Sequence, residues 1–169
     1  MKRLSLLKRF IDLLRILLIA GVVVGLPFCL LLLFAPQAVP MEIMDLSASD
    51  IPTIEVILIT IMVASLYFAI VALRLLSNTL VYFRDGYFFE SEVALNFNRI
   101  GKAIIAGYLI SSLPCIIYQT FTTPVIISGS FTDWLTDTLF TLALGLFFIV
   151  LSEVFLAAKR MKEENDLTV

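Results

Sequence analysis

Four long apolar stretches constrain this chain more than any other feature of its sequence. They cover residues 16–36, 56–73, 103–132 and 138–158. Glu153, in the last stretch, is the only charged residue among them. A bilayer core about 30 Å thick needs about 20 helical residues. Since only helices and closed barrels satisfy their backbone groups in lipid, and no stretch alternates as barrel strands do, the pattern predicts transmembrane helices.

The expected fold is therefore an all-α integral membrane protein with a single domain over residues 1–169 and four spans. The approximate spans are residues 14–35, 54–76, 103–122 and 137–158. The composition agrees, because 60% of the residues are hydrophobic and 15% are charged, against about 45–50% and about 25% in soluble domains. The basic residues before the first span resemble a signal peptide, but its apolar run exceeds the usual length of about 7–15 residues, which favours an uncleaved anchor.

Several classes of function are disfavoured by what the sequence lacks. It contains no histidine, the usual metal ligand and the side chain best suited to proton transfer near neutral pH. It has no Ser/His/Asp set, phosphate loop, HExxH or CxxC motif. A net charge of -2 argues against direct nucleic-acid binding. We therefore expect no enzymatic activity, no catalytic residues, and no metal or cofactor.

The basic residues predict the orientation of the spans. All twelve lie in three segments, before the first span, between the second and third, and after the fourth. The charged residues of the other two loops are all acidic. Because basic segments are retained in the cytoplasm, both termini and the middle loop are expected on the cytoplasmic side.

The middle segment predicts a helical hairpin that projects from the second and third spans. No glycine or proline interrupts Ile54–Asp85, and Gly86 suits the left-handed position after a helix. Glu90 or Ser91 can begin the next helix, with acids in its first turn. One face of that helix is apolar at i, i+4 and i+7, through Val93, Phe97 and Ile100. Residues 77–102 are thus expected to form a cytoplasmic hairpin, and residues 159–169 a cytoplasmic tail.

Small residues recur every four positions on two of the spans and predict close helix contacts. They are Gly21, Gly25 and Cys29 on the first span, and Gly107, Ser111 and Cys115 on the third, where Ala103 precedes them. The two faces either pack on each other within one subunit, which we favour, or one of them mediates a homo-oligomer. Pro27 and Pro114 are expected to kink their helices.

Glu153 is a functional candidate because ionisable residues within spans are rare. Its position six residues before Lys159 favours a place near the inner interface, where it can reach lipid headgroups or Arg74. The alternative is a role in proton transfer.

Two cytoplasmic segments resemble a known family. Residues 86–101 are similar to a Gly-x-Pro-Phe-x-x-Glu-Asn…Leu-x-x-Ile-Gly signature, and residues 156–169 to a tail that ends in Glu-Glu-x-Asp-Leu-Thr-Val. Both belong to a YoaS-like bacterial family of four-helix membrane proteins of unknown function. Phe88 and Val93 depart from the signature, which has proline and asparagine there. The resemblance implies a multi-pass protein of the bacterial cytoplasmic membrane, with a helix-turn-helix regulator as a possible partner.

The favoured function is a non-enzymatic membrane module that engages a cytoplasmic protein partner, possibly that regulator. The candidate docking residues are Gly86, Phe89, Glu92, Phe97, Glu163, Glu164, Asp166, Leu167, Thr168 and Val169. In the tail, the basic part is expected at the anionic leaflet and the acidic part in the cytoplasm. A frayed terminus is the alternative. The alternative function is a small dimeric transporter or channel that uses Glu153.

Overall fold

The chain folds into long helices that are each able to cross a membrane. The computed structural model describes residues 2–39, 42–43, 46–47, 51–122 and 129–167. Within these residues the helices are α1 (Lys2–Phe34), α2 (Thr53–Arg84), α3 (Ser91–Thr122) and α4 (Gly129–Leu167). All four are long and apolar enough to span a bilayer, which confirms the expected all-α fold with four candidate spans.

The connection between α1 and α2 contains short elements that the sequence did not predict. A 3-10 helix, η1 (Pro36–Ala38), follows α1. Two antiparallel strands of two residues each, β1 (Glu42–Ile43) and β2 (Leu46–Ser47), then pair with Ile43 opposite Leu46.

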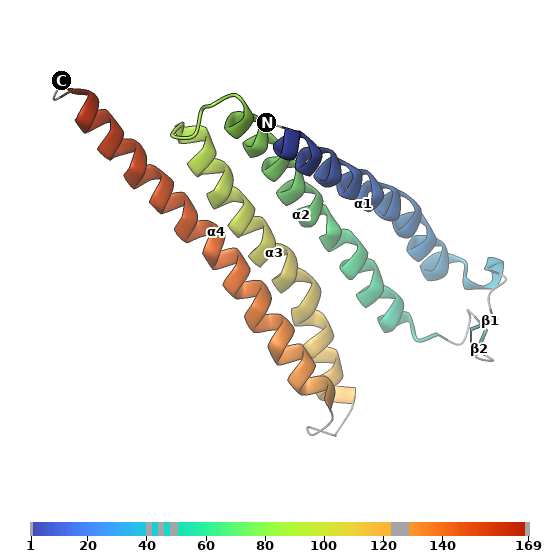
Figure 1. The fold of residues 1–169 in the computed structure, drawn as a ribbon. Coiled ribbons are helices and arrows are strands. Elements are labelled where there is room, and N and C mark those ends of the chain that lie inside the picture. Colours follow the sequence, from blue (N-terminus) through green and yellow to red (C-terminus); the bar gives the residue numbers. More distant parts are fainter. Residues whose placement is uncertain (1, 40–41, 44–45, 48–50, 123–128, 168–169) are drawn as a thin grey trace.

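The helices form an open row in which each packs on its neighbours in sequence. α1 contacts α2, α2 contacts α3, and α3 contacts α4, so that α1 and α4 lie at the two edges (Figure 1). Successive helices run in opposite directions. Both ends of the chain and the turn between α2 and α3 therefore lie toward the same end of the row (Figure 1).

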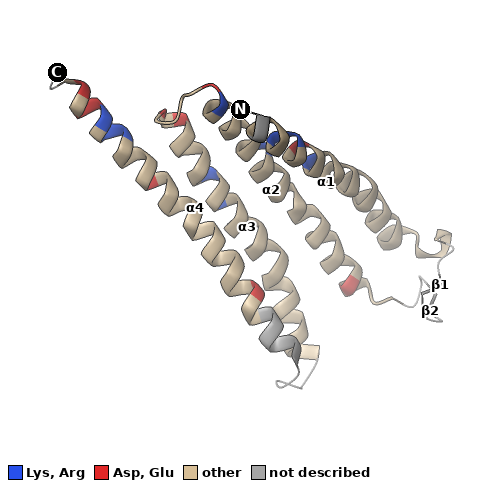
Figure 2. Cartoon of the chain, in the orientation of Figure 1, with Lys and Arg blue, Asp and Glu red and all other residues tan. Residues whose placement is uncertain are grey.

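Charge separates the two ends of the molecule. Lys and Arg residues lie toward the end that holds the α2–α3 turn, whereas the far end carries acidic positions and no basic ones in the described part of the chain (Figure 2). We call the first of these the basic end. All four helices extend beyond their predicted spans. The extensions of α2 and α3 form the expected hairpin, whereas the sequence did not predict that α1 begins at Lys2 or that α4 runs from Gly129 to Leu167.

The best-buried part of the molecule lies toward the basic end. Its core consists of Ala72, Val93, Phe97, Ile100 and Ala103. The sequence predicted the apolar face formed by Val93, Phe97 and Ile100, and all three side chains are buried. Elsewhere the apolar surface of the helices is largely exposed, as expected where lipid replaces a protein core.

Candidate functional site

An aromatic stack joins three helices at the basic end. Phe97 of α3 lies at the centre, with its ring centroid 5.2 Å from that of Phe155 and 6.0 Å from that of Phe148, both in α4. Phe83 of α2 completes the stack at 6.2 Å from Phe97. Phe97 is only 4% exposed. Phe97 is therefore a core residue beneath the α2–α3 turn, and not an exposed docking residue as the sequence suggested.

The turn between α2 and α3 has the glycine geometry that the sequence predicted. Gly86 has a φ of 87°, a conformation that only glycine adopts without strain. The backbone N–H of Gly86 donates to the carbonyl of Phe83, and that of Tyr87 donates to the carbonyl of Tyr82. These two hydrogen bonds close the end of α2 as a Schellman motif.

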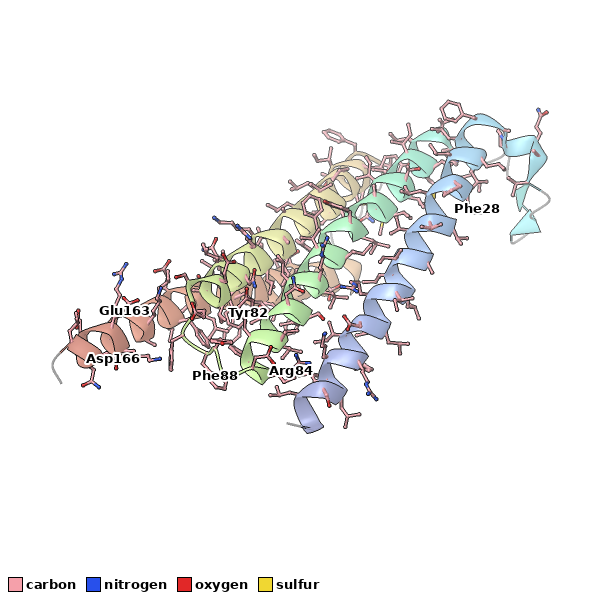
Figure 3. All side chains as sticks on the ribbon, turned by 90° about the horizontal axis from the view of Figure 1, so that it is seen from above. Phe28, Tyr82, Arg84, Phe88, Glu163 and Asp166 are labelled. Atoms are coloured by element: carbon pink, nitrogen blue, oxygen red, sulfur yellow. The ribbon has the colours of Figure 1, made fainter. Side chains whose placement is uncertain are left out.

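Three aromatic residues are presented at the tip of this hairpin. Tyr87, Phe88 and Phe89 are 58%, 47% and 43% exposed, although Phe88 also stacks on Phe83 beneath it. Figure 3 shows Phe88 beside Arg84 at this tip.

The C-terminal part of α4 packs against the hairpin. Lys159 Nζ donates to Ser91 Oγ, at the start of α3, and lies 3.5 Å from Glu163. The Nζ of Lys162 lies 5.9 Å from the centre of the Phe89 ring, within the range of a cation–π contact. The hairpin and the tail therefore form one surface, which we call the hairpin–tail surface and define by residues 86–92 and 159–167.

The predicted docking residues occupy different parts of this surface. Phe89 and Glu92 lie exposed on the hairpin, whereas Gly86 shapes its turn. Four exposed residues lie on α4, and Figure 3 shows two of them, Glu163 and Asp166, on the part of α4 that extends past the other helices. The four are Glu163, Glu164, Asp166 and Leu167. Thr168 and Val169 lie outside the described residues.

An exposed ion pair stands at the base of the hairpin tip. Arg84 Nε donates to Asp85 Oδ1 over 2.8 Å. This hydrogen bond is the main reason that the pKa of Asp85 lies below its usual value and that of Arg84 above it. Because its pKa is lowered, the Asp85 carboxylate stays charged to a more acidic pH than an isolated aspartate does.

A second polar contact, which the sequence analysis missed, ties α1 to α2. Ser77 Oγ, 3% exposed, donates to Asp12 Oδ1 over 2.8 Å. Asp12 also lies 3.8 Å from Arg15. The sequence signal that could have indicated this contact is Asp12 itself, an acidic residue in an N-terminal segment that is otherwise mainly basic and apolar.

Glu153 lies on an exposed face of α4, whereas its neighbour Ser152 is buried against the rest of the bundle. The acid therefore does not point into the row of helices.

Within the described residues no metal-ligating cluster of His, Cys, Asp and Glu occurs.

The two predicted stripes of small residues do not meet. Gly25 packs on Val63 of α2, and Gly107 packs on Phe68 of the same helix. Each stripe therefore approaches α2, which corrects the expectation that they pack on each other. Gly21 has open space where a side chain would lie. Of the other members, Cys29 is buried, Cys115 is half-buried, and Ser111 donates to the backbone carbonyl of Tyr108.

A very close contact between α3 and α4 involves two glycines that the pattern of small residues did not indicate. A Cβ atom on Gly101 would lie 2.5 Å from the backbone oxygen of Gly145 in α4. The two backbones approach each other directly at this point. In sequence the pair was hidden, because neither glycine has small residues four positions away on both sides.

Contacts between neighbouring helices show which residues lie at the same height. Asp12 of α1 meets Ser77 of α2, and Phe68 of α2 meets Gly107 of α3. Counting along the helices from these contacts places one basic residue each of α1, α2 and α3 at nearly the same height along the long axis of the bundle. We call these residues the basic layer: Arg15, Arg74 and Lys102.

The basic layer meets α4 near Gly145, since Gly101 adjoins Lys102 and packs on Gly145. From there α4 continues to Leu167, about 33 Å at 1.5 Å per residue.

Comparison with known proteins gave one match. The family model described as "Protein of unknown function (DUF2975)" matches residues 39–169. No curated protein and no solved structure matches the chain. The match supports the expected family of unknown function, whereas the YoaS-like name stays a prediction.

Proposed function

The chain belongs to the DUF2975 family of proteins of unknown function, and we propose that it is a membrane module that docks a protein partner in the cytoplasm. In this proposal four helices anchor the chain in a bacterial cytoplasmic membrane, and the hairpin–tail surface binds the partner. The module has no enzymatic activity of its own. The observation that carries the proposal is the contact between the hairpin and the tail, which joins two separate segments into one exposed surface on a packed aromatic core.

The basic layer supports a position for the membrane. From Arg15, Arg74 and Lys102 to the far ends of α1, α2 and α3 the helices measure about 28–32 Å at 1.5 Å per residue. This equals the thickness of a bilayer core, about 30 Å. Lysine and arginine at a span boundary can extend their charged groups to the headgroups. The hairpin and the C-terminal part of α4 then lie outside the lipid.

The distribution of charge supports the orientation. Every basic residue belongs to the basic end or to the segments that lead into it, and the far end carries acids such as Glu55 and Asp137. Under the positive-inside rule the basic end faces the cytoplasm. Both termini and the hairpin are then cytoplasmic.

The chemistry of the surface indicates what kind of partner it would bind. Exposed aromatic residues supply apolar contact area with little loss of side-chain freedom, as in many protein interfaces. The acidic end of α4 adds Glu163, Glu164 and Asp166, which favour a partner with a basic face. A helix-turn-helix regulator, which needs a basic face for DNA, meets the charge requirement.

Reporter fusions test the orientation. Fusions after Lys8, Arg84 and Val169 are expected to read as cytoplasmic, because these positions lie within or after the three basic segments. Fusions near Asp45 and Asp133 are expected to read as external. Asp45 and Val169 lie outside the described residues, so the signals expected at these two positions follow from the predicted topology and not from the structure. A cytoplasmic signal at Asp45 would contradict the four-span topology.

Truncation and substitution test the docking surface. Deleting Asn165–Val169, or replacing Tyr87 and Phe89 with serine, is expected to leave the chain in the membrane and to abolish co-purification of its partner. The measurement is crosslinking in native membranes, followed by mass spectrometry of the captured proteins. Phe34→Ser, which changes an exposed aromatic residue at the far end, is the matched control. Undiminished capture by both variants would reject the surface.

The transporter remains the second candidate, and its requirements differ. It needs a polar path along the helices, with Glu153 facing that path, whereas Glu153 lies on the exposed face of α4. Proton-coupled flux in vesicles that is lost in Glu153→Gln would favour the transporter over docking.

A further inference from the structure

α4 carries an apolar seam on the face that no other helix covers. Its members are exposed and follow one another at alternating intervals of three and four residues. They are Phe140, Ala143, Phe147, Val150, Val154, Ala157 and Met161. The opposite face of α4, which contains Gly145, Phe148 and Phe155, packs against α3 and α2.

The spacing of the seam is that of a coiled coil. Apolar residues repeated every 3.5 positions remain on one stripe when two helices wind around each other. From Phe140 to Met161 the stripe covers three heptads, about 32 Å of helix, and none of its members is charged. Glu153 and Arg160 flank the stripe one heptad apart, in the rim positions where coiled coils carry charges.

The outer part of the seam needs protein to cover it. Lipid can cover Phe140 and Phe147, so their exposure alone indicates nothing. Under the membrane position proposed above, however, the span of α4 ends near Gly145 and not at residue 158 as the sequence predicted. Val154 and Met161 then lie about 13 and 24 Å past the edge of the lipid. They are 57% and 63% exposed. Outside the lipid, apolar side chains on a continuous stripe mark an interaction surface.

We propose that α4 pairs along this seam with α4 of a second copy of the chain. Any occupant must cross the membrane beside α4 and then continue as a helix beyond the basic layer, as α4 itself does. Two copies with the same membrane orientation are related by a twofold axis along the membrane normal, so that identical residues meet at identical heights. The resulting interface is a parallel two-stranded coiled coil that begins in the membrane and ends in the cytoplasm.

The other edge of the row offers a rival surface. α1 also exposes apolar residues at its edge, among them Leu6, Phe10 and Leu13. However, α1 lies outside residues 39–169, which the family model matches, whereas α4 lies wholly within them. The pairing of α4 with α4 does not need a docked partner, but it rests on the membrane position proposed above.

Disulfide crosslinking with depth-matched controls tests the pairing. In a background with Cys29→Ala and Cys115→Ala, single cysteines are placed in the seam by Val150→Cys and Ala157→Cys. The controls, Leu13→Cys and Leu6→Cys, lie at similar heights on the exposed edge of α1. After oxidation of native membranes, most of each seam variant is expected to migrate as a dimer and each control as a monomer. Equal or greater dimer formation by the controls, or none in the seam, would overturn the pairing.

A mass measurement with a charged variant completes the test. Val154→Arg places a charge in the seam outside the lipid, where the isolated subunit tolerates it because Val154 is exposed. The protein in lipid nanodiscs is expected to change from the mass of two chains to that of one, with its helical content unchanged. Either a wild-type chain with the mass of one subunit or a variant that retains the mass of two would contradict the proposal.

Discussion

Replacing Gly101 with leucine is expected to force α3 and α4 apart and to prevent the normal packing of the bundle. A Cβ atom alone would lie 2.5 Å from the backbone oxygen of Gly145 and 3.1 Å from the backbone nitrogen of Ile149. Backbone atoms cannot rotate away as a flexible side chain can. Overpacking a tight contact typically costs about 1–3 kcal/mol. Gly101→Ala should fall in this range and Gly101→Leu above it.

The measurement is thermal unfolding of the detergent-solubilised protein. For a chain of this size each kcal/mol corresponds to about 2–4 °C in melting temperature. Gly21→Leu is the matched control, because no atom lies within 4 Å of a Cβ placed on Gly21. We expect the control to melt like the wild type. If Gly101→Leu also melted like the wild type, the close contact of α3 with α4 would be refuted.

Replacing Phe97 with alanine is expected to have the second large effect, a loss of about 3–5 kcal/mol in the free energy of unfolding. The side chain is 4% exposed and stacks on aromatic rings from α2 and α4. Its removal leaves a cavity among Phe83, Phe148 and Phe155, none of which can fill the space without leaving its other partners. Under the membrane position proposed above, this part of the bundle lies outside the lipid, so lipid does not replace the lost contacts.

Two measurements distinguish this effect from a general loss of hydrophobicity. Phe10→Ala removes an equally large ring from the basic end of α1, where it is 57% exposed, and should leave the melting temperature nearly unchanged. Protease sensitivity should increase in the hairpin of Phe97→Ala. Equal melting of Phe97→Ala and Phe10→Ala would show that the aromatic stack does not stabilise the bundle.

The hairpin was predictable because its signals are local. The absence of glycine and proline from Ile54 to Asp85, the glycine at position 86 and the acids near Ser91 each act through neighbouring backbone groups. The helix ends at Arg84 and Ser91 agree with them. The buried face of Val93, Phe97 and Ile100 was also predictable, since an apolar stripe at helical spacing on a helix that also has a polar face is expected to face a protein core.

The contacts that build the candidate surface were not predictable in the same way. Lys162 meets Phe89, and Lys159 meets Ser91, across nearly seventy residues of sequence. Such pairs depend on how far α4 extends and on which of its faces turns toward α3.

What the sequence determined by itself is the number of helices able to cross a membrane and the separation of charge along the chain. Both follow from length and composition, because the thickness of the bilayer and the transfer of charged groups into lipid do not depend on how the helices pack. Only the tertiary structure decided which glycines touch and which face of α4 remains free. In lipid, packed and lipid-facing surfaces are equally apolar, so hydrophobicity cannot distinguish Gly21, which faces open space, from Gly101, which contacts a neighbouring backbone.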